Sequence, residues 1–323
     1  MSVEIKGFGL AQADTCITNK DLMKYVETSD EWIKERTGIE QRYFSSTDNT
    51  SDLGVKASLK AIENAKIDPK SIDLIIVATI TPDSMMPSTA NLIQAKLGLN
   101  NQKCLAFDVN AACSGFLIAL QNAQAMIQSG FAHTALVIGA ETLSKILDFE
   151  DRTTCILFGD GAGAVILSNS DRDGSIGHYS RSEGDLDEVL TTDAFSLNSD
   201  FKTNLKQSYY LHMKGQAVFR FAVKAMEDAI HEICKQENIR LDEIDWIVPH
   251  QANKRIIQHV SSKLNIDINK FYLNLDKYGN TSSASIPIAL ADMNEKGLLE
   301  KNQKIILVGF GAGLTWASTY FVV

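Results

Sequence analysis

Residues 104–128 read CLAFDVNAACSGFLIALQNAQAMIQ, and this stretch decides the fold. Its apolar run at 104–109 predicts a buried strand. Small and polar residues follow, and a helical period then runs to Gln128, with Gly130 as the stop signal. A buried strand that leads directly into a helix is typical of α/β proteins, in which crossover helices join parallel strands.

The same alternation continues along the whole chain. Further buried strands are predicted at 74–79, 135–140, 162–167, 246–249 and 305–310. A helix is predicted to end near Leu97, because Ser88 and Thr89 follow Pro87 and can cap its start. We therefore expect an α/β fold.

A similarity of pattern between two distant parts of the sequence predicts that the chain is duplicated. The first part of the chain gives the order strand, helix, strand, helix, strand over residues 72–98, 104–130 and 134–142. The second part repeats this order over residues 244–265, 271–297 and 304–313. In this repeat, a strand is expected at 272–275. We expect two similar halves, 1–172 and 173–323, joined through the loop SNSDRDGS, and a surface excursion at about 182–207. Chance resemblance between α/β units is the alternative.

The composition restricts the classes of function. Of 323 residues, 45% are apolar and 22% charged, as in a globular protein with a large core. The net charge of −9 argues against nucleic-acid binding, which relies on Lys and Arg to neutralise phosphates. We find no signal peptide or membrane-spanning run, and the five cysteines form neither a disulfide pattern nor a zinc site. These features predict a cytoplasmic protein with reduced thiols.

Three polar residues follow predicted strands at matching places in the two halves. Cys113 follows the strand at 104–109, Asn280 follows the corresponding segment of the second half, and His250 ends the strand at 246–249. In an open α/β sheet, ligands bind at the carboxyl ends of the strands. We therefore expect these three side chains to meet at one edge.

Cys113 has the chemistry of a nucleophile toward thioesters. A thiol at a helix N-terminus lies near the positive end of the helix dipole, so we expect a lowered pKa for Cys113 and a strong nucleophile. Taken alone, each residue has a structural interpretation: an inert buried cysteine, a turn histidine and a turn asparagine. Their matching positions favour the catalytic interpretation.

Two glycine clusters superficially resemble nucleotide-binding loops. GDGAG at 159–163 leads into an apolar strand, and GFGAG at 309–313 has only ten residues after it. Neither fits a G-x-G-x-x-G turn that opens a strand–helix–strand unit. Close backbone approach at tight turns explains both clusters better, and the second could also direct a backbone N–H at an oxyanion.

Five motifs occur in this order: DVNAACSGF (108–116), DRTTCILFGDGAGA (151–164), VPHQANKRI (248–256), YGNTSSASIP (278–287) and GFGAGLTW (309–316). Together they resemble β-ketoacyl-acyl carrier protein synthase III, the initiating condensing enzyme of bacterial type II fatty acid synthesis. The resemblance covers essentially the whole chain. It implies the thiolase-like fold, with two duplicated halves in α-β-α-β-α layers, and a homodimer.

The resemblance also implies the reaction. Cys113 would take an acyl group from acyl-CoA and hold it as a thioester. His250 and Asn280 would hydrogen-bond the carbonyl of malonyl-acyl carrier protein and stabilise the enolate left by decarboxylation. The backbone amides of Cys113 and Ala312 would form the oxyanion hole. No cofactor or metal is implied.

The CoA site follows from the same resemblance. Trp32 and Arg152 match the pair that sandwiches the adenine, through the stacking that indole and guanidinium groups favour. Arg36, Gly215 and Asn253 match positions that line the pantetheine tunnel. Without the resemblance, Trp32 would be interpreted as a partly buried helix anchor.

A basic patch is implied for the acidic carrier protein. Arg220, Arg255 and Lys263 match its positions, and their alternative interpretation is ordinary solvated charge. Because the chain as a whole is acidic, such a partner would need a focused cationic patch.

The acyl pocket departs from the family pattern at two positions. Ala312 replaces a common glycine, and Met86 replaces a Phe that reaches into the partner subunit's acyl pocket in many members. Leu143 and Phe158 are further candidates for the pocket wall. A flexible Met could change which acyl chains fit.

Other functions remain as alternatives at this stage. A Cys-His-Asn hydrolase of thioesters or peptides would need His250 beside the sulfur as its base. A non-catalytic acyl- or CoA-binding relative is a second alternative. Within the family, a starter-unit synthase of a polyketide or quinolone pathway is the third.

Overall fold

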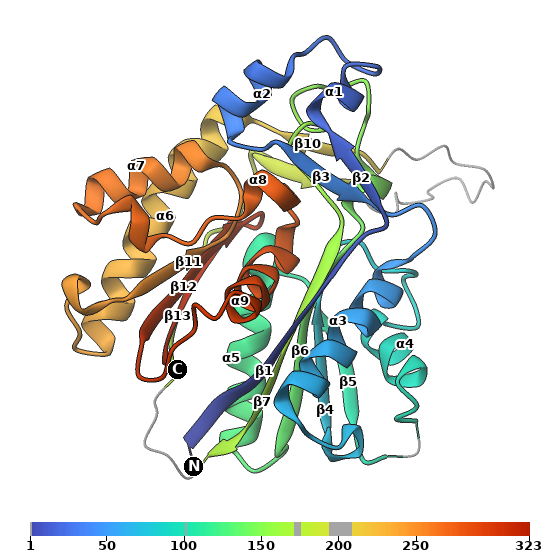
Figure 1. Cartoon of the computed structure of the whole chain (residues 1–323), viewed down its shortest axis with the longest axis vertical. Helices are drawn as coiled ribbons and strands as arrows, with labels where there is room; N and C mark the ends of the chain where they lie inside the picture. The colour runs from blue at the N-terminus through green and yellow to red at the C-terminus, as the bar shows by residue number, and fades with distance from the viewer. Residues whose placement is uncertain (1, 101, 171–175, 194–208) are drawn as a thin grey trace.

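Two large mixed sheets form the framework of the protein (Figure 1). The computed structural model describes residues 2–100, 102–170, 176–193 and 209–323. The first sheet contains, in spatial order, β1 (Ser2–Gln12), β7 (Gly161–Ser170), β6 (Thr134–Glu141), β4 (Leu74–Ala78) and β5 (Leu105–Val109). The second contains β11 (Trp246–Pro249), β12 (Lys304–Gly311), β13 (Thr315–Val322) and β8 (Gly177–Ser182).

The two sheets repeat one pattern of pairing. In the first, β4 pairs in parallel with β5 and β6, while β7 pairs antiparallel with β6 and β1. In the second, β11 pairs in parallel with β12, while β13 pairs antiparallel with β12 and β8. The predicted fold class is therefore confirmed. The predicted join between residues 172 and 173 lies outside the described residues.

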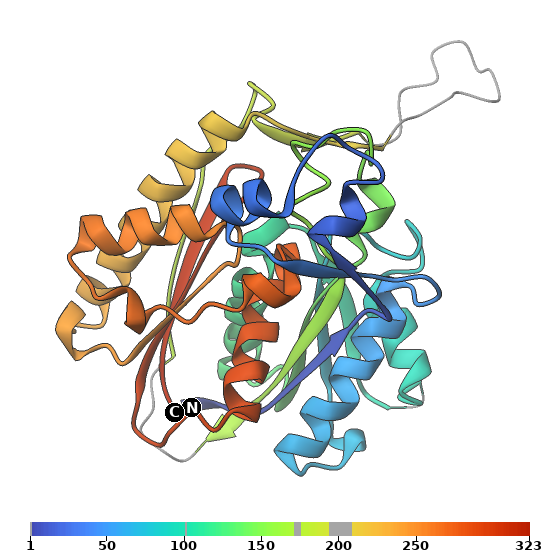
Figure 2. The same ribbon diagram turned by 45° about the horizontal axis from the view of Figure 1, so that its top comes forward.

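Helices fill the other three layers (Figures 1 and 2). The central pair, α5 (Gly115–Gln128) and α9 (Ser285–Glu295), lies between the sheets and shares one hydrophobic core with both. The outer face of the first sheet is covered by α3 (Thr50–Ala65) and α4 (Thr89–Lys96), and that of the second by α6 (Gly215–Gln236) and α7 (Lys254–Leu264). This gives the five alternating layers that the resemblance implies.

Smaller elements lie above one end of the sheets (Figure 2). They are two strand pairs, β2 (Thr15–Thr18) with β3 (Gln41–Phe44) and β9 (Leu190–Thr192) with β10 (Leu211–Met213), and the short helices α1 (Asn19–Leu22), α2 (Asp30–Thr37) and α8 (Leu275–Tyr278). Residues 194–208, most of the expected surface excursion, lie outside the described residues. Within the described residues, no helix is both long and apolar enough to span a bilayer.

The helix boundaries follow the local signals. The Ser88 side chain accepts a hydrogen bond from the Asn91 amide and caps α4, as predicted. The helix α5 ends at Gln128, and Gly130 takes the left-handed conformation (φ +77°) that allows the chain to leave it.

The strand expected at 272–275 is wrong. Only Phe271 forms a bridge, to Ile247 of β11, and α8 begins at Leu275. The side chain of Gln251 replaces the neighbouring strand. It donates a hydrogen bond to the carbonyl of Tyr272 (3.0 Å) and accepts one from the amide of Asn274 (3.1 Å). These two backbone groups are therefore hydrogen-bonded without a neighbouring strand.

Candidate active site

Two equivalent 3₁₀ turns from opposite halves build the site. η2 (Ala112–Ser114) precedes α5, and η6 (Ser282–Ala284) precedes α9. Each begins with a non-glycine residue at positive φ, +45° at Ala112 and +48° at Ser282. This conformation is uncommon for a residue with a side chain, and such positions cluster at functional sites. The similarity between the two halves of the sequence thus extends to the backbone conformation of the two turns.

Each turn packs against a glycine in a strand of the other half. A Cβ on Gly311 of β12 would lie 2.6 Å from the amide nitrogen of Cys113, and one on Gly139 of β6 would lie 2.3 Å from the carbonyl oxygen of Ser283. Only glycine permits backbones to approach so closely. The GFGAG cluster therefore supplies close packing, as expected from its sequence.

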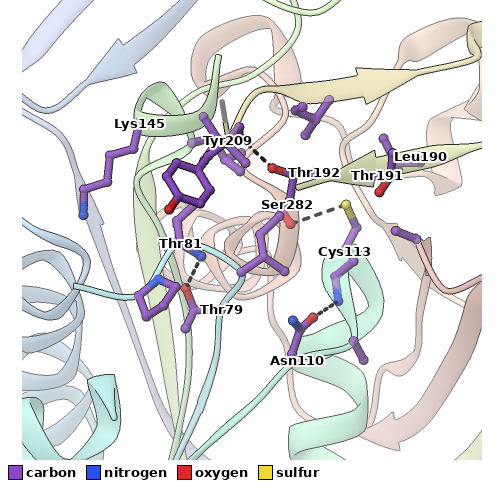
Figure 3. Close-up of a pocket in the computed structure, with 18 of the residues that line it drawn as sticks. Thr79, Thr81, Asn110, Cys113, Lys145, Leu190, Thr191, Thr192, Tyr209 and Ser282 are labelled. Carbon is purple, nitrogen blue, oxygen red and sulfur yellow. Dashed lines mark hydrogen bonds between the residues drawn. The ribbon is translucent and has the colours of Figure 1, made fainter. Parts of the chain in front are cut away.

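Cys113 is buried, with 7% of its surface exposed, and its sulfur lies 3.4 Å from the Ser282 hydroxyl (Figure 3). Burial raises the pKa of the thiol to about 12, and the hydrogen bond between Cys113 and Ser282 only partly opposes this rise. The lowered pKa expected from the helix dipole is therefore wrong. The residue lies in η2, before the first residue of α5, and its burial is the largest cause of the shift.

His250 directly follows β11 and is almost fully buried. Its Nδ1 lies 2.7 Å from the hydroxyl of Ser285, the first residue of α9. Its ring meets that of Phe310 edge-on, at 5.4 Å between centroids. Burial lowers the pKa of His250 to about 3, so the imidazole is neutral at physiological pH.

Asn280 follows α8 at the start of the turn that leads to η6. Its Oδ1 accepts a hydrogen bond from the amide of Ser282 (2.9 Å), and this bond fixes the orientation of the side-chain amide. The Nδ2 donors therefore face away from the turn.

The sulfur and the imidazole have different partners. The structure gives a hydrogen bond from Cys113 to Ser282 and, among the described residues, none from Cys113 to His250. A Cys-His hydrolase needs its base beside the sulfur. This geometry favours a condensing enzyme, in which the imidazole serves the second substrate.

A buried carboxyl lies beneath the turns and was not anticipated from the sequence. Glu141, at the end of β6, accepts hydrogen bonds from the hydroxyls of Thr81 (2.6 Å) and Ser283 (2.7 Å) and from the amide of Ile80 (3.1 Å). Burial raises its pKa, and these donors oppose the rise. Glu141 thereby ties the first half to η6.

A cavity of about 920 Å³ opens at the thiol (Figure 3). Cys113, Ala312, Leu143 and Phe158 line it, together with Ser282 and the apolar side chains of Met85, Leu190 and Leu211. Met86 is not among its lining residues and is 86% exposed. His250 and Asn280 are also absent from the lining, and both are buried.

Four of the five predicted CoA residues, Trp32, Arg36, Arg152 and Asn253, lie together where α2 meets α7. The Cζ atoms of Arg152 and Arg36 lie 5.3 and 5.8 Å from the centroid of the Trp32 ring. Asn253 caps α7 and donates to the carbonyl of Arg36 (3.1 Å). Gly215 begins α6, where an added Cβ would meet nothing closer than 3.9 Å.

The predicted docking residues lie on the outer helices of the second half. Arg220 is exposed on α6, and Arg255 and Lys263 are exposed on α7. Lys263 forms an ion pair with Glu227 (3.0 Å), which reduces its contribution to a cationic surface. In the described parts of the chain, no group of three or more His, Cys, Asp or Glu residues is placed to hold a metal ion.

Two family models match the chain. One, described as 3-oxoacyl-[acyl-carrier-protein] synthase III, matches residues 107–184, and one for the C-terminal part of the same family matches residues 234–323. A β-ketoacyl-[acyl-carrier-protein] synthase III of Clostridium acetobutylicum is 49% identical over 98% of this chain and 97% of its own length. One of Clostridium perfringens is 51% identical over 97% and 96%.

Solved structures give the same result. The 3-oxoacyl-[acyl-carrier-protein] synthase III of Aquifex aeolicus is 41% identical and superposes with a TM-score of 0.92 over 100% of both chains. A priming β-ketosynthase from the R1128 polyketide pathway is 30% identical, with a TM-score of 0.92 over 100% of this chain and 96% of its own.

The burial of Cys113 predicts how its alkylation depends on pH. Because the thiol is the form present at neutral pH, the rate of modification by iodoacetamide should rise about tenfold per pH unit from pH 7 to 9.5, without a plateau. Peptide mapping separates Cys113 from the exposed Cys16, which serves as the reference for the reagent. A plateau below pH 8 would show that the thiol ionises in the ordinary range and would refute this account.

Proposed function

The chain belongs to the β-ketoacyl-acyl carrier protein synthase III family, and we propose that Cys113, His250 and Asn280 carry out its condensation. The enzyme is an acyltransferase that joins an acyl starter from acyl-CoA to malonyl-acyl carrier protein. The products are 3-oxoacyl-acyl carrier protein and CO₂, and this step initiates fatty acid synthesis. One observation supports this assignment of residues: two equivalent turns from opposite halves bring the buried Cys113 thiol to a cavity, and the amide of Ser282 in one of these turns orients the Asn280 side chain.

In the first half-reaction, the Cys113 sulfur attacks the thioester carbonyl of acyl-CoA. A new S–C bond forms, the bond to the CoA sulfur breaks, and the proton of the Cys113 thiol leaves with CoA as its thiol. The amides of Cys113 and Ala312 stabilise the tetrahedral oxyanion. The hydroxyl of Ser282, 3.4 Å from the sulfur, stabilises negative charge there.

In the second half-reaction, malonyl-acyl carrier protein loses CO₂, and the electron pair of the broken C–C bond becomes an enolate. His250 and Asn280 donate hydrogen bonds to the enolate oxygen. The carbanion then attacks the acyl-cysteine carbonyl, the C–S bond breaks, and the Cys113 thiolate takes up a proton from solvent. Loss of CO₂ drives the C–C bond formation, so we propose that no cofactor or metal takes part.

CoA binds, in this proposal, where Trp32 and Arg152 stack. The Cζ of Arg152 is only 5.3 Å from the indole centroid, whereas an inserted adenine needs roughly 7 Å between the planes. Arg152 must therefore move outward, away from its present bond to the carbonyl of Glu27 (3.0 Å). Arg36, Gly215 and Asn253 would line the path to Cys113.

We further propose a cytoplasmic homodimer. Met86 is 86% exposed, and β5 is an edge strand whose Leu105 is 43% exposed. These apolar groups support burial against a second subunit. Met86 would then contribute to the partner's acyl pocket, while Leu143 and Phe158 form the walls within one subunit.

A starter-unit synthase of a polyketide pathway is the second candidate. The similarity to the R1128 priming β-ketosynthase favours it. The carrier protein that accepts the product separates the two functions. A clear preference for a fatty acid carrier protein supports the first, and a preference for a polyketide carrier protein supports the second.

Substitution of the donors should separate the two half-reactions. His250→Ala and Asn280→Ala should each slow malonyl decarboxylation at least 100-fold, because a lost oxyanion donor costs about that much, while the rate of Cys113 acylation stays near wild type. Stopped-flow acylation and release of labelled CO₂ measure the two steps. Equal loss of both steps would assign His250 to the sulfur, as in a hydrolase.

The contact at Gly311 should be essential to acylation. A methyl group there would push on the amide of Cys113 at 2.6 Å, and a displacement of about 1 Å costs roughly 100-fold in rate. Gly311→Ala should therefore slow acyl-enzyme formation about 100-fold. The matched control is Gly309→Ala in the same strand, where the nearest contact is 3.4 Å. Wild-type acylation by Gly311→Ala would refute the packing argument.

The carrier-protein patch can be tested by charge reversal. Arg255→Glu should raise KM for malonyl-acyl carrier protein at least fivefold and leave KM for acyl-CoA within about twofold, because only the carrier protein presents an extended acidic surface. Lys70→Glu makes the same charge change in the distant turn η1 (Pro69–Ser71) and serves as the control. An unchanged ratio of the two KM values would remove Arg255 from the docking surface.

A further inference from the structure

Ser285 makes the only hydrogen bond to the His250 ring that the described residues provide. The hydroxyl lies 2.7 Å from Nδ1, at the first residue of α9, and is buried. The backbone amide of Gln251 also points at the Ser285 oxygen, at 3.5 Å. Both residues of the 250–251 turn therefore converge on one hydroxyl.

Among the described residues, the structure provides one acceptor for the proton of this hydroxyl. A serine in a helix often donates to the carbonyl four residues earlier, but the structure gives no such bond for Ser285. The amide of Gln251 is a donor and cannot accept. Since buried hydroxyl protons are almost always bonded, the proton of Ser285 goes to Nδ1 of His250.

We propose that Ser285 is a positioning residue that holds His250 as the tautomer with its proton on Nε2. In a neutral imidazole, a proton accepted at Nδ1 leaves the N–H at Nε2. His250 then presents a donor to the enolate oxygen and has no free lone pair for the Cys113 proton. The inference rests on the role proposed above for His250 in decarboxylation, and it explains why this histidine serves the second substrate.

The tautomer can be observed directly by nitrogen NMR. In protein labelled with ¹⁵N-histidine, long-range ¹H–¹⁵N spectra distinguish protonated from unprotonated ring nitrogens, and the His250→Ala variant assigns the signals among the 6 histidines. We expect a protonated Nε2 and an unprotonated Nδ1 in the wild type at pH 7. Ser285→Ala should show both tautomers and lose about tenfold in malonyl decarboxylation, with acylation unchanged.

Two further variants separate positioning from stability. Ser285→Thr keeps the hydroxyl and should restore the tautomer and most of the rate. Ser318→Ala removes another buried hydroxyl, which donates to the carbonyl of Ala229 (2.7 Å), and should leave the His250 signals unchanged.

Specific outcomes would overturn the proposal. A wild-type spectrum with Nδ1 protonated refutes it without any variant, as does a Ser285→Ala protein with wild-type signals and rate. If instead His250→Ala decarboxylates normally, the proposed function of His250 fails, while the wild-type spectrum still decides whether Ser285 fixes the tautomer.

Discussion

The reciprocal packing of two turns against two glycines is the constraint on which the site depends. η2 of the first half packs on β12 through Gly311, and η6 of the second packs on β6 through Gly139. Each turn thus packs closely against a strand of the other half. The thiol and its Ser282 partner therefore meet only when both sheets are stacked on the central helix pair. Large cores on each side of the two sheets keep this arrangement rigid.

The side chains of Cys113, His250 and Asn280 carry no charge at neutral pH. Burial holds Cys113 as a thiol and His250 as a neutral imidazole, and Asn280 is oriented by the amide of Ser282. In the proposed mechanism, such a site stabilises charge only as it develops on the substrate, through donors that are already in place. An uncharged site of this kind suits a reaction in which the oxyanion and the enolate both form from thioesters.

Much of this could be predicted from the sequence, because strands followed by helices leave local signals. The strands and the helix after Cys113 were predicted from apolar runs, a cap at Ser88 and a stop at Gly130. Three features could not be predicted, because they depend on contacts between distant segments. Desolvation reverses the expected pKa shift of Cys113, the Gln251 side chain replaces a strand at 272–275, and Glu141 and Ser285 acquire partners only in the fold.

Intact-protein mass spectrometry tests the central claim most directly. The protein is mixed with an acyl-CoA, and malonyl-acyl carrier protein is added afterwards. Our account predicts one acyl group per chain on Cys113, none in Cys113→Ser, and its transfer to a 3-oxoacyl product only when the malonyl partner is present. An acyl group on another residue, or its loss to water at the same rate without that partner, would contradict the assignment of Cys113 as the nucleophile of a condensing enzyme.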